Sequence, residues 1–161
     1  GGVLLNQCPH NLDLWQWFCG MPKRVRAFCA FGKYHDIEVE DDVTAYVEYE
    51  NGATGLFITT TGEAPGTNRL EITGERGKLV LEGGQLTFWR NREECSTFLR
   101  QSKSGFAKPE CWECNVPAGG QIDQEHTEVT RRWVAKIRGE GELIANGEEG
   151  INSLQLSNAM P

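Results

Sequence analysis

Alternation of apolar and polar residues dominates the middle of this chain and constrains its fold more than any other feature. Period-two segments follow one another from Val25 to Arg90, separated by acidic or glycine-containing turns. The predicted strands are Val25–Phe31, Val43–Tyr49, Ala53–Thr61, Thr67–Thr73, Lys78–Glu82 and Gln85–Arg90. Because successive side chains of a strand point to opposite faces, this pattern is typical of antiparallel strands. The sequence therefore predicts a meander of at least six strands.

Shorter signals define the turns and the flanking elements. Asn51-Gly52 between two alternating segments predicts a hairpin with a type I′ turn. Helical periodicity predicts three helices, over about Gln7–Cys19, from Ile122 to Ile137, and from near Glu148 through Met160. Further strands are expected within Cys95–Ser102 and over Glu110–Val116. The fold class expected from these elements is α+β.

Length and charge exclude several classes of protein. With 161 residues the chain is long enough for one well-packed domain, and no apolar run is long enough to span a membrane. A net charge of -7 with scattered basic residues argues against a nucleic-acid partner. Of the six cysteines, Cys8, Cys19 and Cys29 lie in apolar helix or strand patterns, so we expect reduced thiols and a cytoplasmic location.

The first candidate for chemistry is a polar cluster near the N-terminus. Asn6, His10 and Asp13 are spaced i, i+4 and i+7, which would align them on one face of a helix. An imidazole with an ordinary pKa of about 6.5 can accept or return a hydroxyl proton, and Asp13 could orient the ring or bind a substrate hydroxyl. Spacing alone fits an ordinary helix start at least as well, with Asn6 as an N-cap and His10 on the surface.

Three other motifs give weaker signals. Cys111 and Cys114 form a single Cys-x-x-Cys motif, which on a strand would direct the two sulfurs to opposite faces, so no metal site is expected. Tyr34 and His35 precede the acidic run Glu38–Asp42, which fits either a hydroxyl-binding loop beside His10 or, preferably, a solvated turn. The chain contains no Gly-x-Gly-x-x-Gly after a strand, so it has no dinucleotide-binding fingerprint of its own.

Four segments in order carry a family resemblance. They are residues 1–13 (GGVLLNQCPHNLD), 38–42 (EVEDD), 49–55 (YENGATG) and 70–79 (LEITGERGKL). Their succession resembles the C-terminal domain of the Gfo/Idh/MocA family, nicotinamide-dependent oxidoreductases of sugars, cyclitols and related polyols. The resemblance implies an open-faced, mostly antiparallel sheet of six or more strands with helices packed on one face. It further implies that residues 1–161 form a substrate-binding and oligomerisation domain, inactive alone, whose N-terminal Rossmann partner domain is absent from this chain.

The resemblance also assigns roles to individual residues. His10 corresponds to a catalytic proton-transfer residue, and Asn6 stands where the family usually has Asp, so it can hydrogen-bond but cannot take a proton. The residues expected to bind substrate are Asp13, Tyr34, His35, Asn68 and Arg69. NAD or NADP would be bound mainly by the N-terminal domain, the substrate would be a small polyol, and the sheet face would form a homodimer or homotetramer. The alternative is a non-catalytic oligomerisation or carbohydrate-binding module of the same fold.

Overall fold

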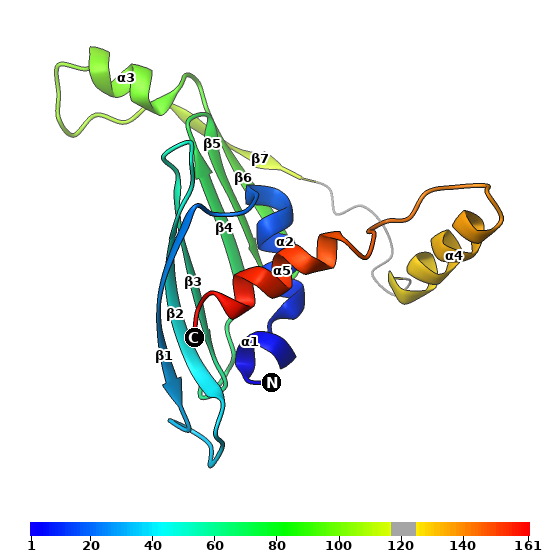
Figure 1. Cartoon of the computed structure of the whole chain (residues 1–161). Helices are drawn as coiled ribbons and strands as arrows, with labels where there is room; N and C mark the ends of the chain where they lie inside the picture. Colours follow the sequence, from blue (N-terminus) through cyan, green and yellow to red (C-terminus); the bar gives the residue numbers. More distant parts are fainter. Residues whose placement is uncertain (117–124) are drawn as a thin grey trace. The chain divides into compact units, whose positions relative to one another are not determined.

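Two compact units make up the chain (Figure 1). A computed structural model describes residues 1–116 and 125–161. The first unit comprises residues 1–64 and 125–161, and the second begins at Pro65 and ends within the segment before Glu125. Each unit has its own antiparallel sheet, so each is described by itself.

The sheet of the first unit contains β1 (Arg24–Phe31), β2 (Glu40–Glu48) and β3 (Thr54–Thr60), in the order β1-β2-β3. Residues of the central strand alternate strictly: Val43, Ala45 and Val47 are fully buried, whereas Thr44 and Tyr46 are exposed. This alternation means that one face of the sheet is covered and the other is open. The period-two prediction is confirmed in this part of the chain.

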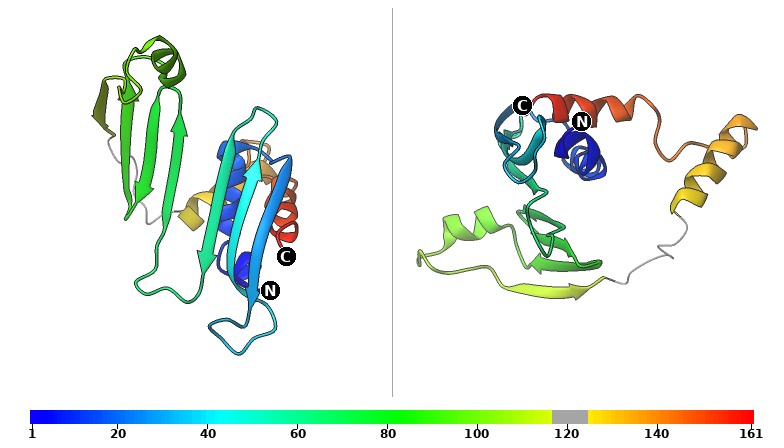
Figure 2. Two further views of the ribbon diagram at one scale, coloured as in Figure 1. Left: turned by 90° about the vertical axis from the view of Figure 1, so that its left-hand side faces the viewer. Right: turned by 90° about the horizontal axis from the view of Figure 1, so that it is seen from below.

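Three helices cover the buried face of this sheet: α1 (Val3–Asn6), α2 (Pro9–Cys19) and α5 (Glu149–Asn158). In the right-hand view of Figure 2 all three lie on the same side of β1–β3. The most deeply buried side chains come from each of these layers and include Leu4, Leu12, Val43, Val47 and Leu156, all at most 2% exposed. The core is therefore formed where α1, α2 and α5 meet β2.

Trp15 fixes the position of α2 on the sheet. Its ring stacks on Phe57 of β3 with centroids 5.6 Å apart, and only 8% of Trp15 is exposed. Gly55 lies beneath the indole, where a Cβ atom would be 2.8 Å from Trp15 Cζ2 and 3.1 Å from Val47 Cγ2. The close approach of α2 to β3 thus depends on the missing side chain at position 55.

The expected first helix is interrupted at Gln7 and Cys8. The backbone N–H groups of both residues donate to the carbonyl oxygen of Val3, each at 3.0 Å, and Cys8 leaves the helical region at φ -112° and ψ 11°. The cause is Pro9, whose ring disfavours a helical conformation of the preceding residue. The prediction of one helix from about Gln7 is therefore wrong at its start, although its end at Cys19 is confirmed.

The hairpin predicted at Asn51-Gly52 is present, but its turn is not type I′. A type I′ turn requires positive φ at both central residues, and only Gly52 has one, at +83°. The N–H of Gly52 donates to the Tyr49 carbonyl at 3.1 Å, and the N–H of Tyr49 donates to the Ala53 carbonyl at 2.9 Å. The loop is thus a type I turn followed by a left-handed glycine, the common three-residue hairpin connection.

The second unit contains β4 (Arg69–Gly74), β5 (Gly77–Glu82), β6 (Gln85–Asn91) and β7 (Cys111–Asn115), paired antiparallel in that order. The strands of the expected meander are present and antiparallel, but they are divided between two sheets. The strand expected within Cys95–Ser102 is instead the helix α3 (Cys95–Gln101). Its first turn is held by Glu75, whose carboxylate accepts from the Ser96 N–H at 2.8 Å, a contact that the local sequence did not indicate.

The C-terminal helices agree with the periodicity of the sequence. α4 (Glu125–Ile137) and α5 (Glu149–Asn158) occupy the two predicted segments, apart from residues 122–124, which lie outside the described residues. The α+β class, with helices packed on one face of an antiparallel sheet, is therefore confirmed. Within the described part of the chain, no helix is both long enough and apolar enough to cross a membrane.

Candidate functional site

His10 lies in the first turn of α2 and is exposed. Across residues 1–116 and 125–161, no hydrogen bond or ion pair involves its imidazole. The helix beneath it is anchored by the buried Leu12 and Trp15. The imidazole is therefore exposed on a well-packed helix, with both ring nitrogens accessible.

Asp13 lies three residues further along α2, so it neighbours His10 on the helix surface. Its Oδ1 accepts a hydrogen bond from Gln16 Nε2 at 3.1 Å, and Gln16 Oε1 in turn accepts from Asn152 Nδ2 of α5 at 3.4 Å. Gln16 is only 7% exposed, so this chain of amides is a structural link between the two helices. It holds the Asp13 carboxylate in place while leaving lone pairs for a hydroxyl group.

Asn6 is not on the same helix as these two residues. It ends α1, is exposed, and is separated from α2 by the break at Gln7 and Cys8. The expectation that one helix face aligns all three side chains is therefore wrong, because Pro9 starts a new helix. His10 and Asp13 remain neighbours on α2, whereas Asn6 belongs to α1.

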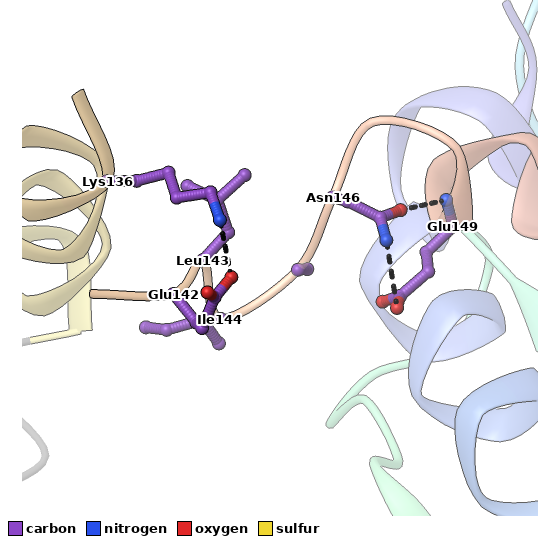
Figure 3. Close-up of a pocket in the computed structure, with 7 residues that line it drawn as sticks. Lys136, Glu142, Leu143, Ile144, Asn146 and Glu149 are labelled. Atoms are coloured by element: carbon purple, nitrogen blue, oxygen red, sulfur yellow. Dashed lines mark hydrogen bonds and ion pairs between the residues drawn. The ribbon is translucent and has the colours of Figure 1, made fainter. Parts of the chain in front are cut away.

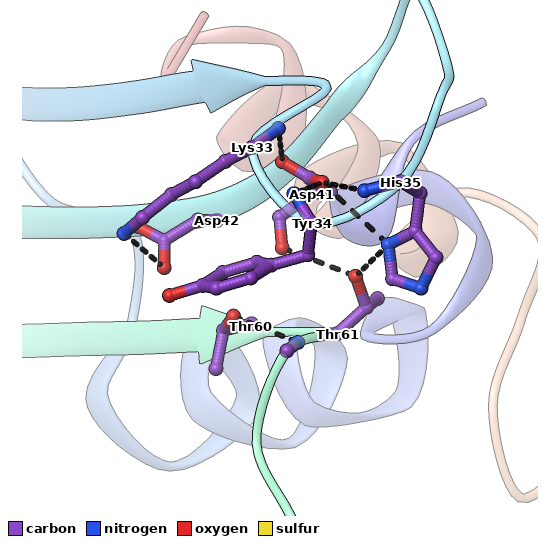
Figure 4. A network of polar contacts seen from close by, with 8 residues as sticks. Lys33, Tyr34, His35, Asp41, Asp42, Thr60 and Thr61 are labelled. Carbon is purple, nitrogen blue, oxygen red and sulfur yellow. Dashed lines mark hydrogen bonds and ion pairs between the residues drawn. The ribbon is translucent and has the colours of Figure 1, made fainter.

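A second polar cluster lies where the connection between β1 and β2 meets the end of β3 (Figure 4). Asp41, whose side chain is fully buried, accepts three backbone hydrogen bonds: from Lys33 at 3.0 Å, Tyr34 at 2.7 Å and His35 at 3.1 Å. The His35 Nδ1 atom lies 3.1 Å from Thr61 Oγ1 and 3.5 Å from Asp41 Oδ2. Tyr34 and His35, both predicted site residues, are thus held by one buried carboxylate.

The charge state of Asp41 follows from these contacts. Burial by itself would raise its pKa, but the backbone N–H groups of Tyr34, Lys33 and His35 outweigh burial and lower the pKa below its usual value. The carboxylate therefore stays ionised inside the fold. An ionised group there accepts all of its hydrogen bonds, which fixes the loop from Lys33 to His35.

The acidic run before β2 is not simply a solvated turn. Glu38 and Asp36 are exposed as expected, but Glu40 is 7% exposed and Asp41 is 0% exposed. Glu40 Oε1 accepts from the Leu4 N–H of α1 at 3.2 Å, and a side chain at Gly2 would overlap its carboxylate. The solvated-turn interpretation is therefore wrong for these two acids, because Glu40 accepts one backbone N–H and Asp41 accepts three, and these hydrogen bonds offset their burial.

Glu40 binds a backbone N–H group of α1, and Asp41 binds those of the Lys33–His35 loop, at the start of β2. Cys8, two residues before His10, has its Sγ 2.8 Å from Thr59 Oγ1, and burial raises the pKa of the Cys8 thiol. Thr59 and Thr61 are two residues apart, a rise of about 7 Å along a strand. Cys8, just before α2, and the loop that carries His35 therefore contact the same end of β3. His10 is two residues from Cys8 in the sequence.

The two remaining predicted residues, Asn68 and Arg69, belong to the second unit. Arg69 is the first residue of β4, and its guanidinium pairs with Glu82 at 2.5 Å and with Glu71 at 2.6 Å. A substrate contact of Arg69 would have to share the guanidinium with these carboxylates. The role of both residues in the site stays a prediction.

Two further places offer less chemistry. A hollow of about 260 Å³ lies between the end of α4 and the start of α5 (Figure 3). Its polar groups pair with one another: Lys136 with Glu142 at 2.6 Å, and Asn146 Oδ1 with the Glu149 N–H at 2.8 Å, which caps α5. It contains none of the predicted site residues. Cys111 and Cys114 both lie on β7, and both are free thiols.

Sequence reasoning missed Asp41, Thr61 and Gln16 as parts of the site. Asp41 could have been found, because it is in phase with Val43, Ala45 and Val47 and so had to face the core. Neither Thr61 nor Gln16 carries such a signal. Their partners are 20 or more residues away in the chain, at Asp41 and Asn152 respectively.

Comparison with known proteins agrees with this architecture. Residues 1–80 match the family model of the GFO/IDH/MocA C-terminal domain. The chain is similar to the WlbA dehydrogenase from Bordetella pertussis, solved in complex with NADH and UDP-GlcNAcA, at 25% identity and a TM-score of 0.70, covering 99% of this chain and 41% of that one. It is also similar to WlbA from Chromobacterium violaceum, solved with the same two ligands, at 27% identity and a TM-score of 0.73, covering 99% and 43%.

A more distant structure shares the fold. UDP-N-acetylglucosamine 3-dehydrogenase GnnA from Acidithiobacillus ferrooxidans is 16% identical with a TM-score of 0.74, covering 98% of this chain and 47% of that one. The chain thus spans less than half the length of each of these three proteins. No curated protein sequence matches it. The ordered motifs, the fold and the match over residues 1–80 together show that the chain belongs to the Gfo/Idh/MocA family and corresponds to its C-terminal domain.

Proposed function

We propose that this chain is the substrate-binding half of a nicotinamide-dependent dehydrogenase that acts on a secondary alcohol of a sugar, cyclitol or related polyol, a sugar nucleotide included. The observation that carries the proposal is the exposed His10 imidazole on a firmly packed helix, beside the held carboxylate of Asp13. The two WlbA structures, solved with NADH and UDP-GlcNAcA, support the cofactor and the substrate class.

The cofactor would be held outside this chain. The residues present do not fit a dinucleotide, because the sequence has no glycine-rich fingerprint after a strand. We therefore propose a partner domain, N-terminal to Gly1, that binds NAD or NADP and supplies the hydride acceptor. On this view the 161 residues are inactive alone, since they contribute one wall of the active site.

Within the chain, His10 would accept the hydroxyl proton of the substrate as the carbinol carbon is oxidised, and return it in the reverse direction. Asp13 would accept a hydrogen bond from a neighbouring hydroxyl and so orient the sugar. Asn6 would contribute a hydrogen bond only, because an amide cannot take up the proton. Tyr34 and His35 would add further contacts to substrate, and the contacts expected of Asn68 and Arg69, in the second unit, stay a prediction.

The test compares kcat for substitutions of two exposed helical histidines, made in a protein that also contains the proposed nucleotide-binding domain. His10→Ala should lower kcat by about 100-fold or more, the usual contribution of a general acid–base group. His126→Ala, on α4, is the matched control and should leave kcat unchanged. Turnover would be followed as NADH formation on a panel of cyclitols, sugars and UDP-GlcNAcA. Equal kcat for the two variants would refute the assignment of His10.

The replacement of the family Asp by Asn6 favours one alternative, a non-catalytic module for carbohydrate binding or oligomerisation. NADH binding separates the two. An enzyme must bind the nicotinamide and oxidise a member of the panel, whereas a scaffold need do neither. Fluorescence titration of the whole protein with NADH, with no binding and no turnover, would favour the scaffold.

The open face of the first sheet is the surface through which we expect the chain to form an oligomer. Its apolar side chains are Phe28, Leu56 and Ile58, which are 80%, 66% and 68% exposed. Facing residues of neighbouring strands, such as Phe28, Thr44 and Ile58, lie in one row across the sheet. We propose that this face packs against a second copy, giving a homodimer or homotetramer. The six free cysteines fit a cytoplasmic protein.

A further inference from the structure

His35 lies in a loop, yet its imidazole contacts two defined side chains of the fold. Its side chain is 50% exposed, yet the Nδ1 atom faces two oxygens of the fold, Thr61 Oγ1 and Asp41 Oδ2. In Figure 4 the Nε2 atom points away from this network. One ring nitrogen is thus engaged by the protein and the other is presented outward.

Two oxygens of the fold bear on which nitrogen of His35 carries the proton. The Thr61 hydroxyl lies 3.3 Å from the Asp41 carbonyl oxygen, to which it can donate its one hydrogen. With the hydroxyl hydrogen directed there, the 3.1 Å contact between Thr61 Oγ1 and His35 Nδ1 is a hydrogen bond donated by Nδ1–H. The Asp41 carboxylate, 3.5 Å away, is an acceptor only and requires the same. Of the two tautomers of the neutral ring, both neighbours therefore favour the one with Nδ1 protonated and Nε2 bare.

We propose that His35 is a substrate-binding residue whose bare Nε2 accepts a hydrogen bond from a sugar or cyclitol hydroxyl, and that Asp41 and Thr61 are positioning residues that fix this tautomer. The inference rests on the proposed function, because it assumes that the ligand is a polyol. It adds what the sequence could not supply: the direction of the hydrogen bond and the two residues that set it.

The rest of the loop supports this role. Asp41 also accepts the backbone N–H groups of Lys33, Tyr34 and His35, so the backbone that carries the imidazole is fixed by the same carboxylate. The N–H of Thr61 donates to the Asp41 carbonyl oxygen at 3.0 Å, which ties the end of β3 to β2. Orientation by a buried carboxylate and a hydroxyl reduces the freedom lost when a substrate hydroxyl binds.

The tautomer can be measured directly by nitrogen-15 NMR of the histidine rings in the full protein, at a pH where titration shows them to be neutral. His10 and His126 are exposed and serve as internal references. We expect the Nδ1–H pattern for His35. Thr61→Val should raise its Nε2–H fraction severalfold, and Asp41→Asn should do the same. Thr44→Val, on the outer face of β2, is the matched control and should leave His35 unchanged.

Binding is tested by titration with myo-inositol, a cyclitol whose only functional groups are hydroxyls. A saturable shift of the His35 Nε2 resonance is expected, weakened at least threefold by Thr61→Val. His10→Ala should lower kcat by about 100-fold or more and preserve this shift, so failure of the proposed reaction and failure of this inference are distinguishable. A mainly Nε2–H ring in the unmodified protein, or no Nε2 shift up to the solubility of myo-inositol, would overturn the proposal.

Discussion

A methyl group at Gly55 should destabilise the first unit, whereas the same group at Gly150 should stabilise it. At Gly55 the added Cβ would lie 2.8 Å from Trp15 Cζ2 and 3.1 Å from Val47 Cγ2, both closer than an ordinary contact. Only 8% of Trp15 is exposed, and its ring stacks on Phe57. The indole therefore has little room to move away from the added methyl group. At Gly150, in α5, nothing lies within 4 Å of the added atom.

The magnitude follows from two opposing effects. Overpacking a filled site costs about 1–3 kcal/mol. Replacing glycine returns about 0.4–1 kcal/mol by restricting the unfolded chain. The net loss for Gly55→Ala is then about 1–2 kcal/mol, and Gly150→Ala should gain about 0.5–1 kcal/mol as a helix position. With a slope near 2 kcal/mol per M urea, the Gly55→Ala midpoint should fall by about 0.5–1 M.

Urea unfolding followed by tryptophan fluorescence measures both midpoints. A double-mutant cycle identifies the cause: in a Trp15→Leu background the cost of Gly55→Ala should largely disappear, because the atom that it strikes is gone. A Gly55→Ala midpoint equal to or above that of the unmodified protein, at an unchanged slope, would refute the close-packing argument. It would also remove the structural reason for the position of α2, and hence of His10.

Two more predictions concern the alkaline limit and the open sheet face. Burial, and after it the neighbouring Cys19, raises the pKa of Tyr49 to about 12. The neutral phenol therefore stabilises the fold below the ordinary pKa near 10, and this contribution should be lost as the pH rises through about 12. Ultraviolet titration of the phenolates checks this, and Tyr49→Phe should flatten the decline; a Tyr49 midpoint near 10 would contradict it. Ile58→Glu, on the open face, should lower the mass measured by light scattering, whereas Ile144→Glu, 55% exposed in the loop before α5, should not. Unchanged mass for Ile58→Glu would show that this face is not the interface.

Much of the fold was readable from local patterns. The strands from Arg24 to Asn91 were predictable because apolar alternation reports which face of a strand is buried. α4 and α5 were predictable because their apolar residues recur every three to four positions. The prediction failed at Cys95–Gln101, where a helix forms with its first turn capped by Glu75, about twenty residues earlier in the chain. It failed again at Asn51, where the backbone adopts a longer hairpin connection that the same dipeptide also permits.

The site divides in the same way. His10 and Asp13 were predicted as neighbours because helical spacing is a local property, and the structure keeps them on α2. Asn6 is separated from them by the helix break before Pro9, whose ring disfavours a helical conformation at Cys8. The order of the loop at Tyr34 and His35 depends on Asp41, whose buried carboxylate accepts their backbone N–H groups. The inward direction of this side chain is a property of the folded chain.

The sequence by itself determined the elements, the covered face of the first sheet and the family motifs, since periodicity, turn residues and residue order are properties of the chain alone. Only the tertiary structure decided that Glu40 and Asp41 turn inward to bind backbone N–H groups, one from α1 and the other from the Lys33–His35 loop. Only there do Asp41 and Thr61 come within contact distance of His35 Nδ1. The physical reason is that a buried carboxylate is tolerated only where donors distant in sequence converge on it, and that convergence exists only in the folded chain.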